Sequence, residues 1–251
     1  MGMRVFRCLS IALCVLALTT PRAVAQSGAF EGWSAVVIAG DWTDSRGQPI
    51  QAFDNALRDL TTSFQRAGFS PDLTAAYSLR PDGGVSARTA IEGAAAVTRR
   101  GGDGCLVYFT SHGSPGRIVF GPGERLEPGR MNALIGDWCG QRPTVVVVSA
   151  CYSGGFMGAL SRPNRMIVTA ARADRSSFGC SADSTYPYFD DCVMQSLETA
   201  SDFIALAGQA RRCVAAREQA EGLTPPSEPQ VFIGGSMQLL LPTLRFDRPS
   251  K

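Results

Sequence analysis

Two stretches, CLVYFTSHG from Cys105 to Gly113 and TVVVVSACYSGG from Thr144 to Gly155, decide the fold class of this 251-residue chain. Each begins as a short, continuous apolar run, which is typical of a strand buried on both faces. Each then changes to small and polar residues, as expected just past the carboxyl end of a strand. Such strands belong to a mainly parallel sheet that helices cover on both faces. The sequence therefore predicts an α/β fold.

The rest of the chain alternates in the same way between strand-length and helix-length segments. Two further strands are predicted at Trp33–Ala39 and Met166–Ala171, and Val231–Ile233 and Met237–Leu241 are candidates for the last strand. Helical periodicity predicts helices at Ala52–Ala67, Ala87–Arg99, Met131–Trp138 and, longest, Cys192–Ala220. Clustered glycine and proline predict loops at Arg80–Gly84, Gly113–Gly129 and Leu223–Pro229. We expect a single domain over residues 26–251.

The amino terminus has the layout of a secretory signal. Two arginines precede an apolar run from Leu9 to Leu18, and a small-residue triplet ends at Ala25. A membrane anchor is the alternative, but a span needs about 20 apolar residues and this run has roughly half that number. We therefore expect residues 1–25 to be removed, leaving an exported protein, periplasmic or secreted, without a membrane span.

Charge excludes two classes of function. Cleavage after Ala25 would remove Arg4, Arg7 and Arg22 but no acidic residue, so the formal charge would fall from +2 to −1. The only lysine is Lys251, and no dense basic stripe is present, so nucleic-acid binding is not indicated. A phosphate-binding P-loop needs a lysine inside its glycine-rich loop and is excluded as well. Nothing in the sequence indicates an oligomeric state.

One histidine and one cysteine lie where peptide chemistry could occur. His112 and Cys151 each follow a predicted buried strand, and ligand crevices form at the carboxyl edge of a parallel sheet. A cysteine nucleophile with a histidine acid/base is the minimum for covalent acyl transfer. The backbone N–H groups of Gly113 and Cys151 are candidate donors to the oxyanion. The alternative is a structural histidine and a core cysteine, which are each common.

Other hydrolase signatures are missing. The sequence contains no GxSxG, which argues against a serine nucleophile elbow. A single histidine cannot form the HExxH zinc motif, so no metal is predicted.

Six cysteines follow the signal segment: Cys105, Cys139, Cys151, Cys180, Cys192 and Cys213. Disulfides are compatible with export. If Cys151 is a free nucleophile, at least one more thiol is unpaired, and Cys105, within an apolar strand, is the favoured candidate. Cys180–Cys192 and Cys139–Cys213 are conceivable bridges, but the sequence leaves the connectivity open.

The pairs His112-Gly113 and Ala150-Cys151 resemble the motifs of the caspase and legumain clan of cysteine peptidases, and most closely legumain-type family C13 in its bacterial members. Further blocks that resemble this family are VVIAGDW and AFDNALRDL near the start, TAARADRSSFGC (Thr169–Cys180) and PSEPQVFIG (Pro226–Gly234). The resemblance implies a caspase/hemoglobinase-like three-layer α/β sandwich. It also implies a Cys151–His112 dyad, a thioester intermediate, a peptide or protein substrate, and no cofactor.

The resemblance also assigns supporting and pocket residues. Asp44 takes the place of a residue that supports the histidine, while the substrate pocket would contain Arg46, Ser149, Ser176 and Asp191, or Asp190 if the loop shifts by one. Each pocket residue is equally compatible with an ordinary loop role. Legumains have an acid at the position of Ser149 and a histidine at that of Gly47, so cleavage after asparagine is not implied.

Two alternatives to a hydrolytic peptidase stay open at this point. A transpeptidase or transamidase would use the same dyad and thioester, with an amine in place of water. A non-catalytic peptide-binding domain of the cell envelope would keep the fold alone.

Overall fold

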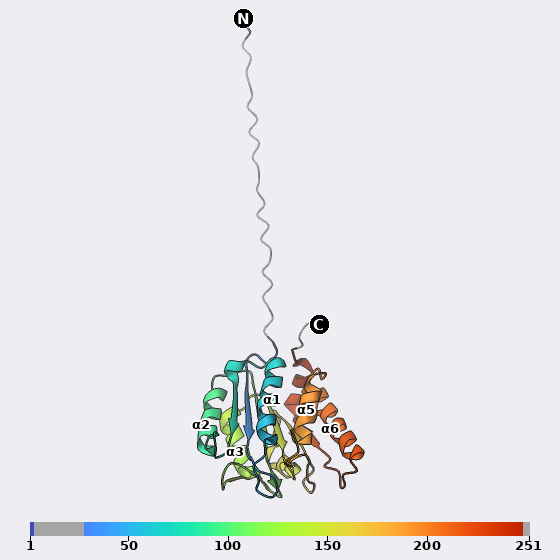
Figure 1. Cartoon of the computed structure of the whole chain (residues 1–251). Coiled ribbons are helices and arrows are strands. Elements are labelled where there is room, and N and C mark those ends of the chain that lie inside the picture. The colour runs from blue at the N-terminus through green and yellow to red at the C-terminus, as the bar shows by residue number, and fades with distance from the viewer. Residues whose placement is uncertain (3–27, 248–251) are drawn as a thin grey trace.

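The computed structural model describes residues 1–2 and 28–247, and nearly all of the predicted signal segment lies outside these residues. A six-stranded sheet in the order β2-β1-β3-β7-β8-β9 forms the centre (Figure 1). The four predicted inner strands are present and parallel: β1 (Trp33–Ala39), β3 (Gly104–Thr110), β7 (Thr144–Ser149) and β8 (Arg165–Thr169). The edges are the parallel strand β2 (Thr74–Ser78) and the antiparallel strand β9 (Gln230–Ile233).

Helices cover both faces of the sheet. Successive residues of a strand point to opposite faces, so they belong to two separate cores. Val36 points to the face covered by α2 (Ala87–Thr98) and α3 (Pro128–Cys139). Val37 points to the opposite face, covered by α1 (Ala52–Arg66), α5 (Tyr188–Leu197) and α6 (Phe203–Ala220) (Figure 1). The shorter elements are η1 (Pro71–Leu73), η2 (Ser153–Phe156), α4 (Met157–Leu160), α7 (Gly235–Leu240) and η3 (Leu241–Thr243). The predicted three-layer α/β fold is confirmed.

The prediction of one long helix over Cys192–Ala220 is wrong. The chain forms two helices, α5 and α6, separated by residues 198–202. The carboxylate of Asp202 accepts a hydrogen bond of 2.9 Å from the N–H of Ala205 and caps α6. Aspartate at this position is a strong signal for a helix start, and it outweighs the apolar period that continues across the break.

Two other segments also differ from the prediction. The region Gly113–Gly129 is not only loop: it forms a small antiparallel sheet of β4 (Gly113–Ser114), β5 (Arg117–Val119) and β6 (Arg125–Leu126), strands too short to show a period. The candidate strand Met237–Leu241 is helical instead. Its buried residues Met237 and Leu241 are four apart, which matches one face of a helix. No helix within residues 28–247 combines the length and apolar character that a bilayer span requires.

The disulfides differ from the conceivable pairs. Cys105 joins Cys139, and Cys192 joins Cys213, while Cys151 and Cys180 are free. The expectation of an unpaired Cys105 is therefore wrong. Cys139 packs in the core beneath α3, whereas Cys213 packs against the opposite core beneath α6, so the sheet separates these two residues. The layers of the fold decide which cysteines can form a disulfide, and the sequence does not show these layers.

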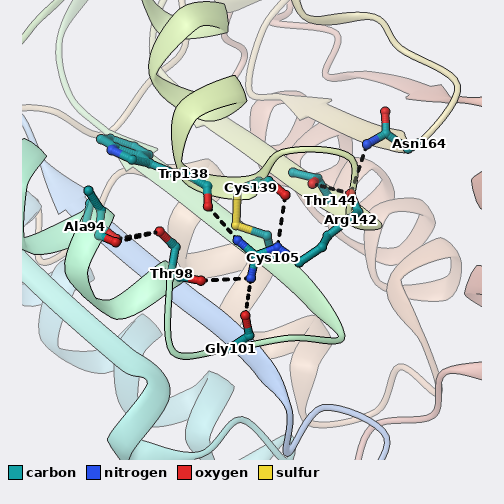
Figure 2. Close-up of a disulfide and its surroundings, with 10 residues drawn as sticks. Ala94, Thr98, Gly101, Cys105, Trp138, Cys139, Arg142, Thr144 and Asn164 are labelled. Atoms are coloured by element: carbon teal, nitrogen blue, oxygen red, sulfur yellow. Dashed lines mark hydrogen bonds between the residues drawn. A yellow bond between two sulfur atoms is a disulfide. The ribbon is translucent and has the colours of Figure 1, made fainter.

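The Cys105–Cys139 bridge ties the start of β3 to the end of α3, beside the half-buried Arg142 (Figure 2). The guanidinium of Arg142 donates to carbonyl oxygens at the carboxyl ends of α2 and α3 and in the following turn, namely those of Thr98, Gly101, Trp138 and Cys139. A cation at these helix ends complements the partial negative charge of the unpaired carbonyls. Together the bridge and Arg142 fix the region where β3 begins. This is the opposite end of the strand from the one that His112 follows.

We expect the double substitution Cys105→Ala/Cys139→Ala to lower the free energy of unfolding by about 2–4 kcal/mol. The bridge closes a loop of 34 residues, so its loss gives the unfolded chain more freedom. Replacing both cysteines avoids leaving a buried thiol. Urea unfolding of the variant and of the wild type measures the difference, and equal midpoints would contradict the expectation.

Candidate active site

The two strands that precede His112 and Cys151 are neighbours. β3 and β7 pair in parallel with Thr110 opposite Ser149, so both strands end at the same level. The N–H of Ser111 continues the pairing with a 3.0 Å hydrogen bond to the carbonyl of Ser149. His112 and Cys151 each follow by two residues and are both half-buried. The predicted placement at one carboxyl edge is confirmed.

The turns that carry these residues touch one another. A Cβ atom at Gly113 would lie 2.2 Å from the carbonyl oxygen of Cys151, so only glycine permits this approach. Directly after the cysteine, Tyr152 has a left-handed backbone with φ of 58°, and its N–H donates to the carbonyl of Arg175 at 2.7 Å. The N–H of Cys151 has no acceptor among residues 28–247. This amide is available to a substrate oxyanion.

The imidazole of His112 is held by the backbone of another loop. Its Nε2 lies 2.9 Å from the carbonyl oxygen of Thr43, and the ring of Phe53 packs edge-on at 5.1 Å. Because a carbonyl oxygen only accepts, Nε2 carries the proton. Nδ1 is then the nitrogen left for proton exchange. Within the described part of the chain no hydrogen bond joins the imidazole to the Cys151 thiol.

The Cys151 thiol lies against Ser177. The N–H of Ser177 donates to Sγ at 3.3 Å, and the carbonyl and hydroxyl oxygens of the same serine lie 3.5 Å from Sγ. The nearby thiol of Cys180 is different: burial raises its pKa well above the ordinary value, and the charges of Cys151 and Asp190 add to this effect. Cys180 therefore stays protonated at neutral pH.

A buried carboxylate lies beneath the ends of β3 and β7. Asp190, at the start of α5, accepts hydrogen bonds from the hydroxyls of Tyr108 at 2.6 Å and Thr110 at 2.5 Å. The side chain of Ser149 also hydrogen-bonds to it. Burial raises the pKa of Asp190 from 3.8 to about 6, although the three hydroxyl donors favour the ionised form. Asp190 thus places a negative charge under the cysteine strand at neutral pH.

The sequence profile of the peptidase C13 family matches residues 84–211, slightly more than half of the chain, and this range contains both His112 and Cys151. The chain belongs to the peptidase C13 family. It is therefore a cysteine peptidase, and the predicted family and enzyme class are confirmed.

The fold of this C13 peptidase is similar to that of caspase-1 from Spodoptera frugiperda. The crystal structure of that protein matches with a TM-score of 0.61 over 87% of this chain and 94% of the caspase chain, at 14% sequence identity. Identity this low shows a shared fold and nothing more specific. The sequence has no match among curated proteins.

In the C13 peptidase two of the expected pocket residues have contacts with side chains other than Cys151. Asp191 pairs with Arg217 on α6 at 2.9 Å, so Asp190 rather than Asp191 lies at the strand ends. The two are adjacent on a helix and point about 100° apart. Ser176 is exposed, and its hydroxyl lies 3.5 Å from that of Tyr152. The neighbouring Ser177 contacts the thiol instead; the pair Ser-Ser in the sequence could not show which one does so.

The loop after β1 carries the other expected site residues. Arg46 is exposed, and Gly47 has a positive φ of 78° at the loop tip. The carboxylate of Asp44 accepts from the N–H groups of Arg46 and Gln48, which makes it a support of its own loop. These two hydrogen bonds lower the pKa of Asp44, and the bond from the N–H of Gln48 has the larger effect. The imidazole is bound by the backbone carbonyl of Thr43, and a carbonyl gives no signal in the sequence.

We expect Asp190→Asn to flatten the pH dependence of stability between about pH 4 and 6. Folding raises the pKa of Asp190 from 3.8 to about 6, so the folded state binds this proton more tightly than the unfolded chain. The stability so gained is fully present below about pH 4 and is lost as the pH rises to about 6, on the order of 2–3 kcal/mol.

Urea midpoints at several pH values measure this slope. Asp191→Asn, one residue along α5, is the matched control and should keep most of the slope. An Asp190→Asn variant with the slope of the wild type would contradict the role of this carboxyl.

Proposed function

We propose that the chain is an exported cysteine endopeptidase in which Cys151 is the nucleophile and His112 the acid/base. The observation that carries the proposal is the junction of the two turns: His112-Gly113 and Ala150-Cys151 follow paired strands and touch at Gly113. The free state of Cys151 also supports catalysis, because a disulfide there would favour a binding role. Membership of a peptidase family supports peptide or protein substrates.

The mechanism follows from the direction of each group. The Cys151 thiol passes its proton to Nδ1 of His112, and the thiolate attacks the peptide carbonyl. The oxyanion that forms accepts from the free N–H of Cys151, with the N–H of Gly113 as the second candidate donor. The imidazolium then protonates the leaving amine, and water hydrolyses the thioester. Through both steps the carbonyl of Thr43 accepts from Nε2 and stabilises the positive ring.

Export has separate support. The sequence of residues 1–25 has the form of a secretory signal, and two disulfides within the described residues suit an oxidising compartment. Mass spectrometry of the protein recovered from the periplasm or medium of an expressing cell tests this. The expected amino terminus is Gln26, and an intact protein kept in the cytoplasm would contradict export.

The competing fate of the thioester is aminolysis. Product analysis of a cleaved peptide library, with and without an added amine such as glycinamide, separates the two reactions. Hydrolysis predicts free carboxylates at every cleavage site, with little amide even when the amine is present. Products that carry mainly the added amine would assign the chain to transpeptidases instead.

A further inference from the structure

The loop that holds His112 is anchored at its base and free at its tip. It runs from the end of β1 to Ile50, whose N–H closes the loop on the carbonyl of Trp42 at 2.9 Å. Thr43 and Pro49 form an isolated bridge just beyond this closure. Residues 45–49, at the tip, are exposed. The position of the Thr43 carbonyl is therefore decided at the base of the loop.

Asp41 is the residue that fixes this base. Its side chain is buried, with the residue only 6% exposed. A single carboxylate oxygen, Oδ1, accepts three hydrogen bonds: from the N–H of Trp42 at 2.7 Å, from the N–H of Thr43 at 3.1 Å and from the hydroxyl of Thr43 at 3.0 Å. Two of the three donors belong to Thr43, whose carbonyl binds the imidazole. The orientation of that residue is thus set by the carboxylate.

Asp41 itself is fixed to the strand that carries the histidine. The N–H of the preceding residue, Gly40, donates to the carbonyl of Thr110 at the end of β3, and its carbonyl accepts from the N–H of Gly121, both at 2.9 Å. A Cβ at Gly40 would lie 2.3 Å from the carbonyl oxygen of Val119, so the strand end and the small sheet are in close contact there. Contacts therefore lead from Thr110, at the end of β3, through Asp41 and Thr43 to the imidazole of His112, which follows Thr110 in the chain by two residues.

We propose that Asp41 is the positioning residue of His112, acting through the carbonyl of Thr43. This inference rests on the proposed acid/base role of His112. Asp44, which the family resemblance places behind the histidine, bonds to the tip of the loop, whereas Asp41 bonds to the residue that touches the imidazole. Without the Asp41 carboxylate, Thr43 loses two hydrogen bonds, and its peptide plane is free to turn the carbonyl away from Nε2.

The tautomer of the imidazole reports this geometry directly. His112 is the only histidine of the chain, so ¹⁵N-histidine labelling of a protein made without a histidine tag gives one pair of ring signals. At a pH where the ring is neutral, the wild type should show the Nε2–H form. Asp41→Ala should show a mixture of the two tautomers. Asp41→Asn should keep the Nε2–H form, because an amide oxygen can accept the same three bonds.

Turnover gives the second measurement. A misplaced imidazole slows proton transfer more than it weakens substrate binding, so Asp41→Ala should lower kcat by about 10- to 100-fold with little change in KM. Asp41→Asn should recover most of this loss. Asp54→Ala is the matched control: that carboxylate also anchors a strand end, through Ser78 and Arg80, but lies outside the histidine loop. It should affect stability and leave kcat and the tautomer unchanged.

Three results would overturn the proposal: a wild-type tautomer and kcat in Asp41→Ala, an equal loss in Asp41→Asn and Asp41→Ala, or an equal loss of kcat in Asp54→Ala. If Asp41→Ala does not fold, Thr43→Val is the variant that tests the proposal. It removes one of the three hydrogen bonds to Asp41, so it should produce a smaller shift of the tautomer equilibrium. The absence of any shift in this variant would overturn the proposal. The tautomer needs no turnover. If Asp41→Ala changes the tautomer of His112 but the wild type has no peptidase activity, the proposed function is rejected and the positioning role of Asp41 is kept.

Discussion

Cys151→Ala should lower kcat for peptide hydrolysis by roughly 10⁴-fold or more, because no other group in the site can form the thioester. The substitution removes only the sulfur, and the half-buried position tolerates a smaller side chain. Stability and substrate binding should therefore change little. A fluorogenic peptide found by the library screen measures kcat, and thermal unfolding confirms that the variant is folded.

The matched control is Cys180→Ala. Cys180 is the other free thiol among residues 28–247 and ends the block Thr169–Cys180, but burial raises its pKa and keeps it protonated. This variant should retain most of the wild-type turnover. Equal losses in the two variants would mean that the activity depends on packing in this region and not on one nucleophile.

His112→Ala should lower kcat/KM by about 10²- to 10⁴-fold, the usual contribution of a positioned acid/base. The single imidazole must both accept the proton of the thiol and protonate the leaving amine, and no second histidine can replace it. The loss should appear mainly in kcat. Added imidazole should restore part of the rate, since removal of the ring leaves space between Phe53 and Thr43.

His112→Gln serves as the companion variant. Its amide can still donate to the Thr43 carbonyl, so the loop should remain in place, but it cannot exchange a proton at neutral pH. Losses of similar size in His112→Gln and His112→Ala are expected. A glutamine variant with near wild-type kcat would show that the imidazole has a structural role only.

The inner strands could be predicted because burial on both faces leaves a strong sequence signal, whereas their order in the sheet comes from the structure. The runs LVYF and VVVV admit few other structures, and the polar residues after them mark the carboxyl ends. These positions make His112 and Cys151 a candidate pair, and the resemblance to the C13 family adds the proposed roles of nucleophile and acid/base. Strand β2 was not predicted, since a half-buried edge strand of five residues has neither a long apolar run nor a clear alternation.

The parts that could not be predicted depend on single-residue register or on distant contacts. Asp190 and Asp191 differ by one position on a helix, and that difference sends one to the strand ends and the other to Arg217. Cys105 meets Cys139 only because α3 returns across β3. The support of His112 comes from a backbone carbonyl, whose position no residue type encodes.

We propose Cys151 as the reactive thiol of this C13 peptidase. The most direct measurement is reaction of the mature protein with a peptidyl electrophile, followed by digestion and mass spectrometry of the labelled peptide. We expect one label per chain, on Cys151, with Cys180 unmodified and with much slower labelling in His112→Ala. Labelling on Cys180, or undiminished labelling of Cys151→Ala, would contradict it.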